Sequence, residues 1–221
     1  MMFSATIPNL MSDLLAQYLR NPVRVGVARP GVAADTIARF VPKDEKSEHL
    51  ISLLGGHRGN RSLVFARTKH GAERLMKKLV NAAGFEAASI HGNKSQGQRD
   101  RAIRNFRADE MSVLVATDVA ARVIDIPAVK HVYDYDLPNV SENYVHRIGR
   151  TARACSSGRA VAFCSKEEIA EIWAIEKMLK TPIPVGGGES WEARRVPTAE
   201  QKSRSRPLRS ASRRKTCMRA A

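Results

Sequence analysis

The densest cluster of basic side chains with a regular spacing lies between Tyr144 and Arg153. This ten-residue segment, YVHRIGRTAR, holds three arginines and one histidine and has no carboxylate. Guanidinium groups in such a cluster repel one another unless they are solvated or face an anion. Arg150 and Arg153 are three residues apart, so on one helical turn both would point the same way and could hold a polyphosphate. A solvated basic helix is the alternative interpretation of this segment alone.

A second polar cluster follows a short apolar run at residues 113–116. It contains Thr117, Asp118, Arg122 and Asp125, which we predict to lie in a loop. The apolar run is typical of a buried parallel strand. Because open α/β sheets bind ligands just beyond the carboxyl ends of their strands, the sequence predicts a ligand site here.

A third polar segment, HGNKSQGQR, runs from His91 to Arg99 and follows a strand-like stretch at residues 85–90. In this order, the three segments resemble motifs of the C-terminal RecA-like domain of DEAD-box RNA helicases, which read approximately HGxxxQxxR, ATDVAARGxDIP and YVHRIGRTGR. SLVFARTK at residues 62–69 looks like the family's motif IV, and SAT at residues 4–6 looks like the motif that closes the preceding domain. The resemblance covers about four-fifths of the chain.

The resemblance implies one wall of an ATP site that a second RecA-like domain completes. Arg150 and Arg153 would be the arginine fingers that meet the γ-phosphate, which are worth about 10³- to 10⁵-fold in rate. Asp125 would accept a hydrogen bond from the ribose. His146 would couple the nucleotide site to the SAT strand, and the alternative for it is an ordinary surface histidine. ATP and Mg²⁺ are expected only in combination with an N-terminal RecA-like domain.

The resemblance also implies an RNA-binding edge. Arg99 would hold a phosphate, with Gln96 orienting it, and the alternative for Arg99 is a helix-surface cation. Thr117 and the Thr68-Lys69 pair would contact further phosphates. Because aromatic residues make up only 5% of the chain, it offers no obvious platform for stacking bases. We therefore expect contacts to the backbone of single-stranded RNA with little sequence readout.

The chain also departs from the family. It has no GxxxxGKS/T phosphate loop and no DEAD box, which hold the triphosphate and Mg²⁺. We therefore expect it not to hydrolyse ATP or unwind RNA by itself. Val123 and Cys155 stand where the family has Gly, and a β-branched side chain suits neither positive φ nor a close ligand.

Three interpretations of function remain open. The chain could supply the C-terminal half of a helicase, either to an N-terminal lobe in trans or as the product of a truncated or decaying gene. It could instead be a stand-alone, non-catalytic module that binds or anneals RNA. A DNA-directed helicase domain is the third interpretation, and the motif strings disfavour it.

Hydrophobic patterns predict the elements that position these residues. Strands are predicted at 23–28, 36–41, 62–66, 85–90, 111–116, 131–135 and 160–164, and helices at 8–20, 43–54, 71–82, 96–106, 141–148 and 166–179. This alternation favours an α/β fold, a single RecA-like domain over residues 22–184 with a parallel sheet and helices on both faces. Residues 1–21 would hold the remnant of the SAT motif and an interdomain linker helix.

The net charge of +15 is concentrated in the tail. Residues 193–221 hold ten Lys or Arg and one acid, so the tail carries +9 and the rest of the chain +6. This composition predicts a Gly hinge and a disordered Arg/Ser-rich arm over residues 185–221, able to bind RNA or other polyanions. Three cysteines without CxxC spacing favour reduced thiols in a cytoplasmic protein. No apolar run is long enough to span a membrane, so no membrane partner is expected.

Overall fold

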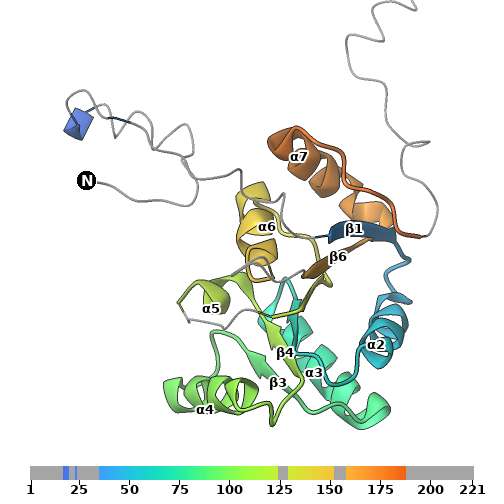
Figure 1. The fold of residues 1–221 in the computed structure, drawn as a ribbon, viewed down its shortest axis with the longest axis vertical. Helices are drawn as coiled ribbons and strands as arrows, with labels where there is room; N and C mark the ends of the chain where they lie inside the picture. Colours follow the sequence, from blue (N-terminus) through green and yellow to red (C-terminus); the bar gives the residue numbers. More distant parts are fainter. Residues whose placement is uncertain (1–16, 20–22, 24–34, 124–128, 152–157, 188–221) are drawn as a thin grey trace, which may run out of the picture. The chain divides into compact units, whose positions relative to one another are not determined.

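The computed structural model describes residues 17–19, 23, 35–123, 129–151 and 158–187 (Figure 1). Most of the predicted helix at 8–20 and of the predicted strand at 23–28 lies outside these residues, as does the basic arm from residue 188 on. Asp125, Arg153 and Cys155 also lie outside them.

Six strands form one sheet in the described part of the chain. They are β1 (Asp35–Phe40), β2 (Ser62–Phe65), β3 (Ala87–Ile90), β4 (Val113–Ala116), β5 (His131–Asp134) and β6 (Arg159–Cys164). The strand order across the sheet is β1-β6-β5-β2-β4-β3, and every neighbouring pair is parallel. All six strands therefore end at the same edge of the sheet, which we call the carboxyl edge.

A helix follows each of the six strands. They are α2 (Lys46–Gly56), α3 (Lys69–Ala83), α4 (Gln96–Arg107), α5 (Asp118–Val123), α6 (Ser141–Ile148), the 3-10 helix η2 (Lys166–Glu168) and α7 (Ile169–Leu179). Helices α2 and α3 lie on one side of the sheet, and α4, α5 and α6 lie on the other (Figure 1). This arrangement confirms the predicted α/β fold with a parallel sheet covered on both faces.

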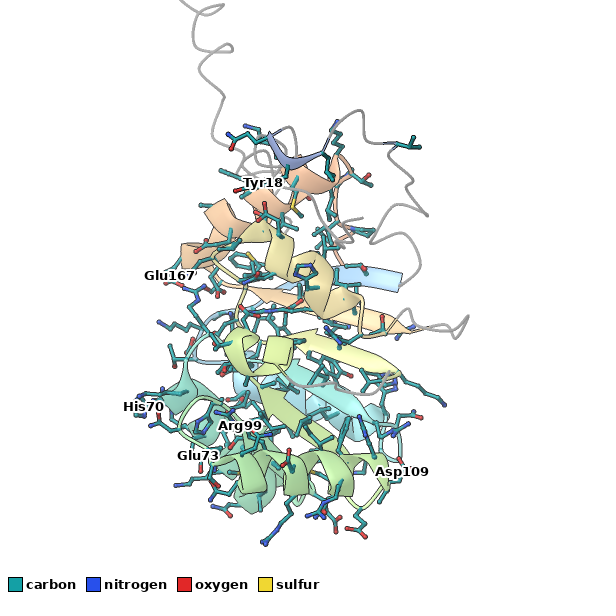
Figure 2. All side chains as sticks on the ribbon, turned by 90° about the vertical axis from the view of Figure 1, so that its left-hand side faces the viewer. Tyr18, His70, Glu73, Arg99, Asp109 and Glu167 are labelled. Carbon is teal, nitrogen blue, oxygen red and sulfur yellow. The ribbon has the colours of Figure 1, made fainter. Side chains whose placement is uncertain are left out.

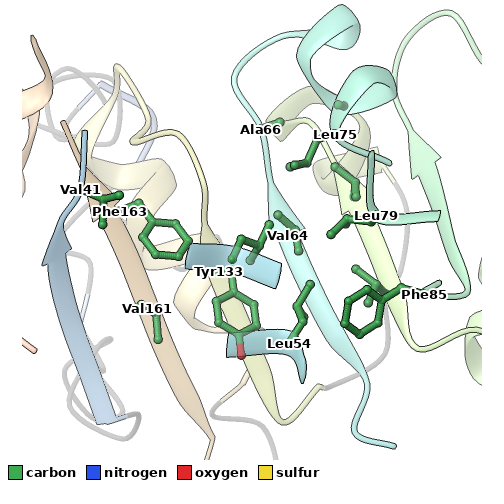
Figure 3. Packing of buried hydrophobic residues seen from close by; sticks show 14 residues of the cluster. Val41, Leu54, Val64, Ala66, Leu75, Leu79, Phe85, Tyr133, Val161 and Phe163 are labelled. Atoms are coloured by element: carbon green, nitrogen blue, oxygen red, sulfur yellow. The ribbon is translucent and has the colours of Figure 1, made fainter. Parts of the chain in front are cut away.

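The core lies between the sheet and the pair α2 and α3 (Figure 3). Leu54 of α2 and Leu79 of α3 pack in one cluster with Val64 of β2 and Tyr133 of β5, and each is at most 2% exposed. Strands β2 and β4 are buried along their whole length. Continuous apolar runs such as these are buried on both faces of the sheet. Burial of the strands holds in place the polar residues that follow them.

The helices that follow β2 and β3 have well-defined first turns at the carboxyl edge. The Thr68 side chain caps α3 by accepting a hydrogen bond from the Gly71 amide at 3.0 Å. Ser95 and Gln98 form a reciprocal capping box at the start of α4. Each cap satisfies amide groups that a helix N-terminus would otherwise leave unpaired.

One prediction about the elements is wrong. The segment after residue 116 was expected to be a polar loop, yet residues 118–123 form α5. Its sequence, DVAARV, contains two alanines and an arginine, which favour helix. Asp118 lies in the first turn, where a carboxylate interacts favourably with the helix dipole. The other predicted strands and helices within the described residues are present, with ends that differ by a few residues.

The chain after α7 pairs with the edge strand β1. The Ala38 amide donates to the Pro184 carbonyl at 2.8 Å, and the Gly186 amide donates to the Ala38 carbonyl at 2.8 Å. A Cβ atom at Gly186 would lie only 3.0 Å from Cδ1 of Ile37, so glycine permits this close approach. The first residues of the predicted hinge are therefore attached to the sheet.

Candidate nucleic-acid and nucleotide sites

The predicted RNA-binding residues gather at the carboxyl ends of three adjacent strands. Thr68 and Lys69 follow β2, Thr117 follows β4, and the segment that leads to Arg99 follows β3. Because β2, β4 and β3 are neighbours in the sheet, these residues form one stretch of the carboxyl edge. We call it the RNA edge.

Contacts between side chains and the loop after β3 hold this stretch together. Lys69 Nζ donates to Asn93 Oδ1 at 3.2 Å, and Arg99 Nη2 donates to the Gly92 carbonyl at 3.3 Å. Gln96 Oε1 lies 3.5 Å from Arg99 Nη1, at the long limit of a hydrogen bond, while its amide donates to Asp100. The side chain of Gln96 therefore lies beside Arg99, and its orienting role stays a prediction.

Thr117 contributes less exposed surface than was expected. The residue is only 7% exposed, and its amide donates to the Ile90 carbonyl at 3.2 Å. Its own carbonyl accepts the first hydrogen bond of α5 from Ala121. Thr117 therefore joins β3, β4 and α5, and only a small part of it faces solvent.

Glu73 of α3 is a residue of this edge that the sequence did not reveal. Its Oε2 accepts hydrogen bonds from Ser89 Oγ at 2.5 Å and from Lys94 Nζ at 3.0 Å, and lies 3.2 Å from His91 Nε2. The hydrogen bond from Ser89 is the largest contribution that lowers the Glu73 pKa to about 2. A lone Glu in a predicted helix gives no sign of these partners, which come from a different strand and loop.

His91 links Glu73 to the loop that carries Asn93. The Asn93 amide donates to His91 Nδ1 at 3.3 Å. Nδ1 must therefore be the unprotonated ring nitrogen, so the proton lies on Nε2 and is donated to Glu73. The Glu73 cluster, defined as Glu73, Ser89, His91 and Lys94, thus fixes the loop at residues 91–94.

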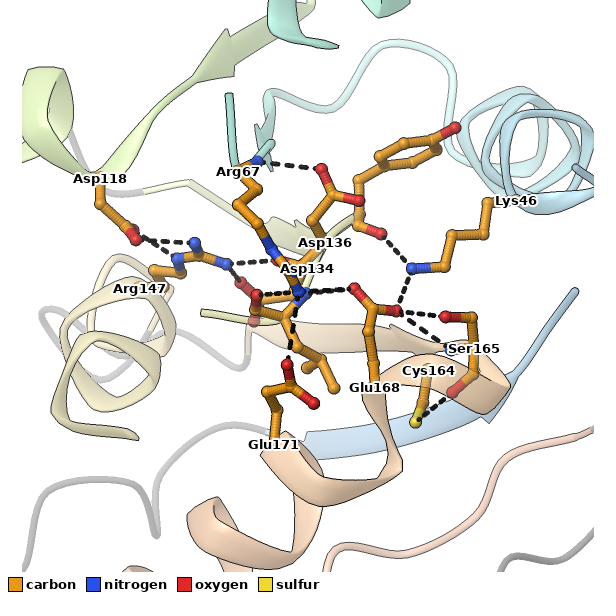
Figure 4. A network of polar contacts seen from close by, with 12 residues as sticks. Lys46, Arg67, Asp118, Asp134, Asp136, Arg147, Cys164, Ser165, Glu168 and Glu171 are labelled. Carbon is orange, nitrogen blue, oxygen red and sulfur yellow. Dashed lines mark hydrogen bonds and ion pairs between the residues drawn. The ribbon is translucent and has the colours of Figure 1, made fainter. Parts of the chain in front are cut away.

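The basic motif on α6 is neutralised from within the protein at one of its arginines. Arg147 is 2% exposed, and its Nε and Nη2 bond Asp118 at 2.6 and 2.9 Å. Its Nη1 bonds Asp134 at 2.6 Å and the Asp136 carbonyl at 2.8 Å (Figure 4). Arg147, to which the sequence assigned no separate role, joins α6 to α5 and to the end of β5.

Burial affects the pKa of Asp134, which pairs with Arg147. Burial raises this pKa to about 6, although the positive charge of Arg147 acts to lower it. The Arg147 guanidinium also lies over the Phe65 ring, 4.8 Å from its centroid. Asp118, which the sequence placed among the ligand-facing groups, is engaged by Arg147 and by the amide of Asn143.

The other described residues of this motif lie beside Arg147. His146 and Arg150 line one small cavity of about 20 Å³, together with Asp118 and Asn143. Helix α6 ends at Ile148, so Arg150 lies in the turn that follows. Arg153 lies outside the described residues, so its predicted place on one helical turn with Arg150 stays a prediction. Gly149, which is unfavourable inside a helix, stands at the end of α6.

A second ion network lies at the ends of β5 and β6. Lys46, which is 1% exposed, bonds Glu168 Oε2 at 2.5 Å and the Tyr135 carbonyl at 2.9 Å. Arg67 Nη2 bonds Glu168 Oε1 at 3.1 Å and the Leu137 carbonyl at 3.1 Å. The two cations share one buried carboxylate (Figure 4).

Metal-binding and membrane-spanning features are absent from the described residues. No group of three or more His, Cys, Asp or Glu side chains there could hold a metal ion. None of the helices described is long and apolar enough to cross a membrane.

Burial raises the pKa of Cys164 to about 12, so this thiol stays protonated at neutral pH.

The chain is similar to known proteins along most of its length. Residues 45–155 match the family described as the helicase conserved C-terminal domain. An ATP-dependent rRNA helicase, RRP3, of Eremothecium gossypii is 41% identical over 186 residues, which are 83% of this chain and 38% of that protein. The chain thus spans about two-fifths of that curated relative.

Solved structures agree with this match. The C-terminal domain of the DEAD-box protein Dbp5 is 33% identical, with a TM-score of 0.65 over 73% of this chain and 95% of that one. Saccharomyces cerevisiae Dbp5 bound to RNA and ADP BeF3 is 30% identical, with a TM-score of 0.73 over 86% of this chain and 52% of that one.

Proposed function

We propose that this chain acts as the RNA-binding C-terminal half of an ATP-dependent RNA helicase. The chain belongs to the helicase conserved C-terminal domain family, and it matches the C-terminal RecA-like domain of DEAD-box proteins. The relatives that it matches carry the names of DEAD-box and rRNA helicases. Since the chain spans only 38% of such a relative, the activity of a whole helicase is part of this proposal. The cytoplasmic location expected from the cysteines is part of it as well.

The observation that carries the proposal is the RNA edge. Lys69 and Arg99 come from different helices, yet both contact the loop at residues 92–93. We propose that these two cations, held against one loop by carbonyl and amide oxygens, bind successive phosphates. The Glu73 cluster keeps that loop in position. Backbone contacts of this kind favour single-stranded RNA without sequence preference.

The nucleotide part of the proposal concerns Arg150, Arg153, Asp125 and His146. His146 and Arg150 line a cavity of only about 20 Å³, so the described residues form a wall and not a pocket for ATP. The chain has neither a phosphate loop nor a DEAD box to hold the triphosphate and Mg²⁺. Two arginines and a ribose contact at about 1.5–3 kcal/mol each barely offset an association cost of about 4–15 kcal/mol.

RNA binding by the purified chain tests the proposal. We expect Arg99→Gln to weaken the binding of single-stranded RNA and to reduce the slope of log affinity against log salt by about 0.7, the value for one phosphate that is no longer neutralised. The matched control is Arg104→Gln, because Arg104 is an exposed cation of the same helix. Equal binding by both variants would contradict the RNA edge. Strong RNA binding without ATPase activity, even beside an N-terminal RecA-like domain, would favour the non-catalytic module.

A further inference from the structure

We propose that the path of the RNA strand continues beyond the RNA edge into a cationic cavity at the carboxyl ends of β2, β5 and β6. This inference rests on the proposed function, because it extends the same ligand along the same edge. The cavity has a volume of about 540 Å³ and lies between the starts of α2, α3 and η2. That volume falls within the range of about 300–1,000 Å³ that is common for ligand pockets.

The cavity has a basic lining. Five cations line it, Lys43, Lys46, Arg67, Arg74 and Lys78, together with three carboxylates, Asp136, Glu167 and Glu168. Tyr135 and Leu75 also line it. The excess of positive charge favours an anionic occupant, and the arrangement of the ion pairs shows which cations remain for it.

Two of the five cations are engaged by the protein itself. Lys46 and Arg67 share the carboxylate of Glu168. The Arg67 amide also donates to Asp136 Oδ2 at 2.9 Å, which occupies a second carboxylate of the lining. These two cations and two carboxylates leave the inner part of the cavity electrically close to neutral.

The other three cations lie at the rim. Lys43, Arg74 and Lys78 are exposed, and none of them forms an ion pair with a carboxylate of the residues that the structure describes. Lys78 Nζ donates to a neutral partner, Ser47 Oγ, at 2.5 Å. Arg74 and Lys78 are four residues apart on α3, so their side chains project from the same side of the helix. Glu167 is the remaining carboxylate at this rim.

The cavity is continuous with the RNA edge. The strand order β6-β5-β2-β4-β3 places β2 between the two sites. Thr68 lines the cavity, and its neighbour Lys69 contacts the Asn93 loop of the RNA edge. Arg99, His70 and Glu167, which mark the two sites and the start of α3, lie along the same side of the molecule (Figure 2).

A polyanionic strand fits these facts better than a compact ligand. The three rim cations come from two segments that border the cavity, and past Thr68 the site leads to the cations of the RNA edge, Lys69 and Arg99. A strand that covers both rows would neutralise more phosphates than one confined to the RNA edge. Each additional neutralised phosphate adds about 0.7 to the magnitude of the salt slope for a single strand.

RNA length separates the two sites in an experiment on the full chain. We would measure binding of oligouridylates of about 5 and about 12 nucleotides, lengths within the range of single-strand binding sites, across a salt series. The test variant is Arg74→Gln with Lys78→Gln. The matched control is Lys130→Gln with Arg159→Gln. These two exposed cations lie at the amino ends of β5 and β6, away from the cavity. Both variants have the same net charge and the same tail.

The two oligonucleotides give distinct outcomes. We expect the test variant to lose at least several-fold in affinity for the long RNA, with a salt slope smaller by about 1.4 because two fewer phosphates are neutralised, and to bind the short RNA as the control does. Equal losses in the test and control variants on the long RNA would overturn this inference and leave the RNA edge intact. Failure of the unsubstituted chain to bind either RNA would overturn the proposed function and this inference with it.

Discussion

Arg147 shows that residues of one motif can have different physical roles. Its guanidinium is buried and divides its hydrogen bonds between Asp118 and Asp134, whereas Arg150 lies in the turn after α6. A buried arginine that satisfies two carboxylates is a structural group, because its removal leaves charges in a medium that solvates them poorly. Arg147 therefore anchors the helix α6, and Arg150 lies in the turn that follows it.

Replacement of Arg147 should lower the stability of the domain. We expect Arg147→Met to reduce the free energy of unfolding by about 3–5 kcal/mol, the usual effect of removing one partner of a buried ion pair. Arg147→Lys should also destabilise the fold, since an ammonium cannot reproduce the two-pronged contact with Asp118. Urea denaturation followed by circular dichroism measures both. Unfolding of Arg147→Met at the same urea concentration as the exposed control Arg104→Met would refute this account of the pair.

At the level of elements, the loop between β3 and α4 is the part of the RNA edge that depends most on its neighbours. It is fixed by the Glu73 cluster on one side and by the capping box of α4 on the other. Because Glu73 belongs to α3 and Ser89 to β3, the cluster also determines how the two elements sit around the loop.

Loss of the Glu73 charge should loosen this loop. We expect Glu73→Gln to accelerate amide hydrogen exchange of Asn93 and Lys94 by about 10- to 100-fold, since a hydrogen bond to a charged group contributes about 1.5–3 kcal/mol. Exchange at Gly71, whose amide is bonded by Thr68, is the internal control. Unchanged exchange at Asn93 would mean that the loop is held by its own capping box alone.

Much of the element pattern could be predicted from the sequence, but the partners of its charged residues could not. Apolar runs such as residues 62–66 identified the strands because buried parallel strands need no polar alternation. Asp118 and Asp134 meet Arg147 because β4 and β5 lie on either side of β2, and no local pattern specifies that order. Helix α5 was missed because six residues carry too little periodicity to distinguish a short helix from a loop.

For the whole molecule, the strand order determines how the sites are distributed. The RNA edge lies over β2, β4 and β3, and the cationic cavity lies over β2, β5 and β6. His146, in α6, and Arg150, in the turn after it, line a cavity of about 20 Å³. The proposed nucleotide site therefore needs a second domain that brings the phosphate loop and the metal ligands, whereas the proposed RNA contacts all come from this domain.

ATP turnover by a two-domain chain tests this account most directly. The N-terminal RecA-like domain of a DEAD-box helicase would be joined upstream of this chain, and ATPase activity measured with and without single-stranded RNA. We predict RNA-stimulated turnover that falls by about 10³-fold or more in Arg150→Ala, as expected for an arginine finger, and is unchanged in Arg104→Ala. Turnover that is equally fast in Arg150→Ala would contradict the proposal that this chain completes a nucleotide site.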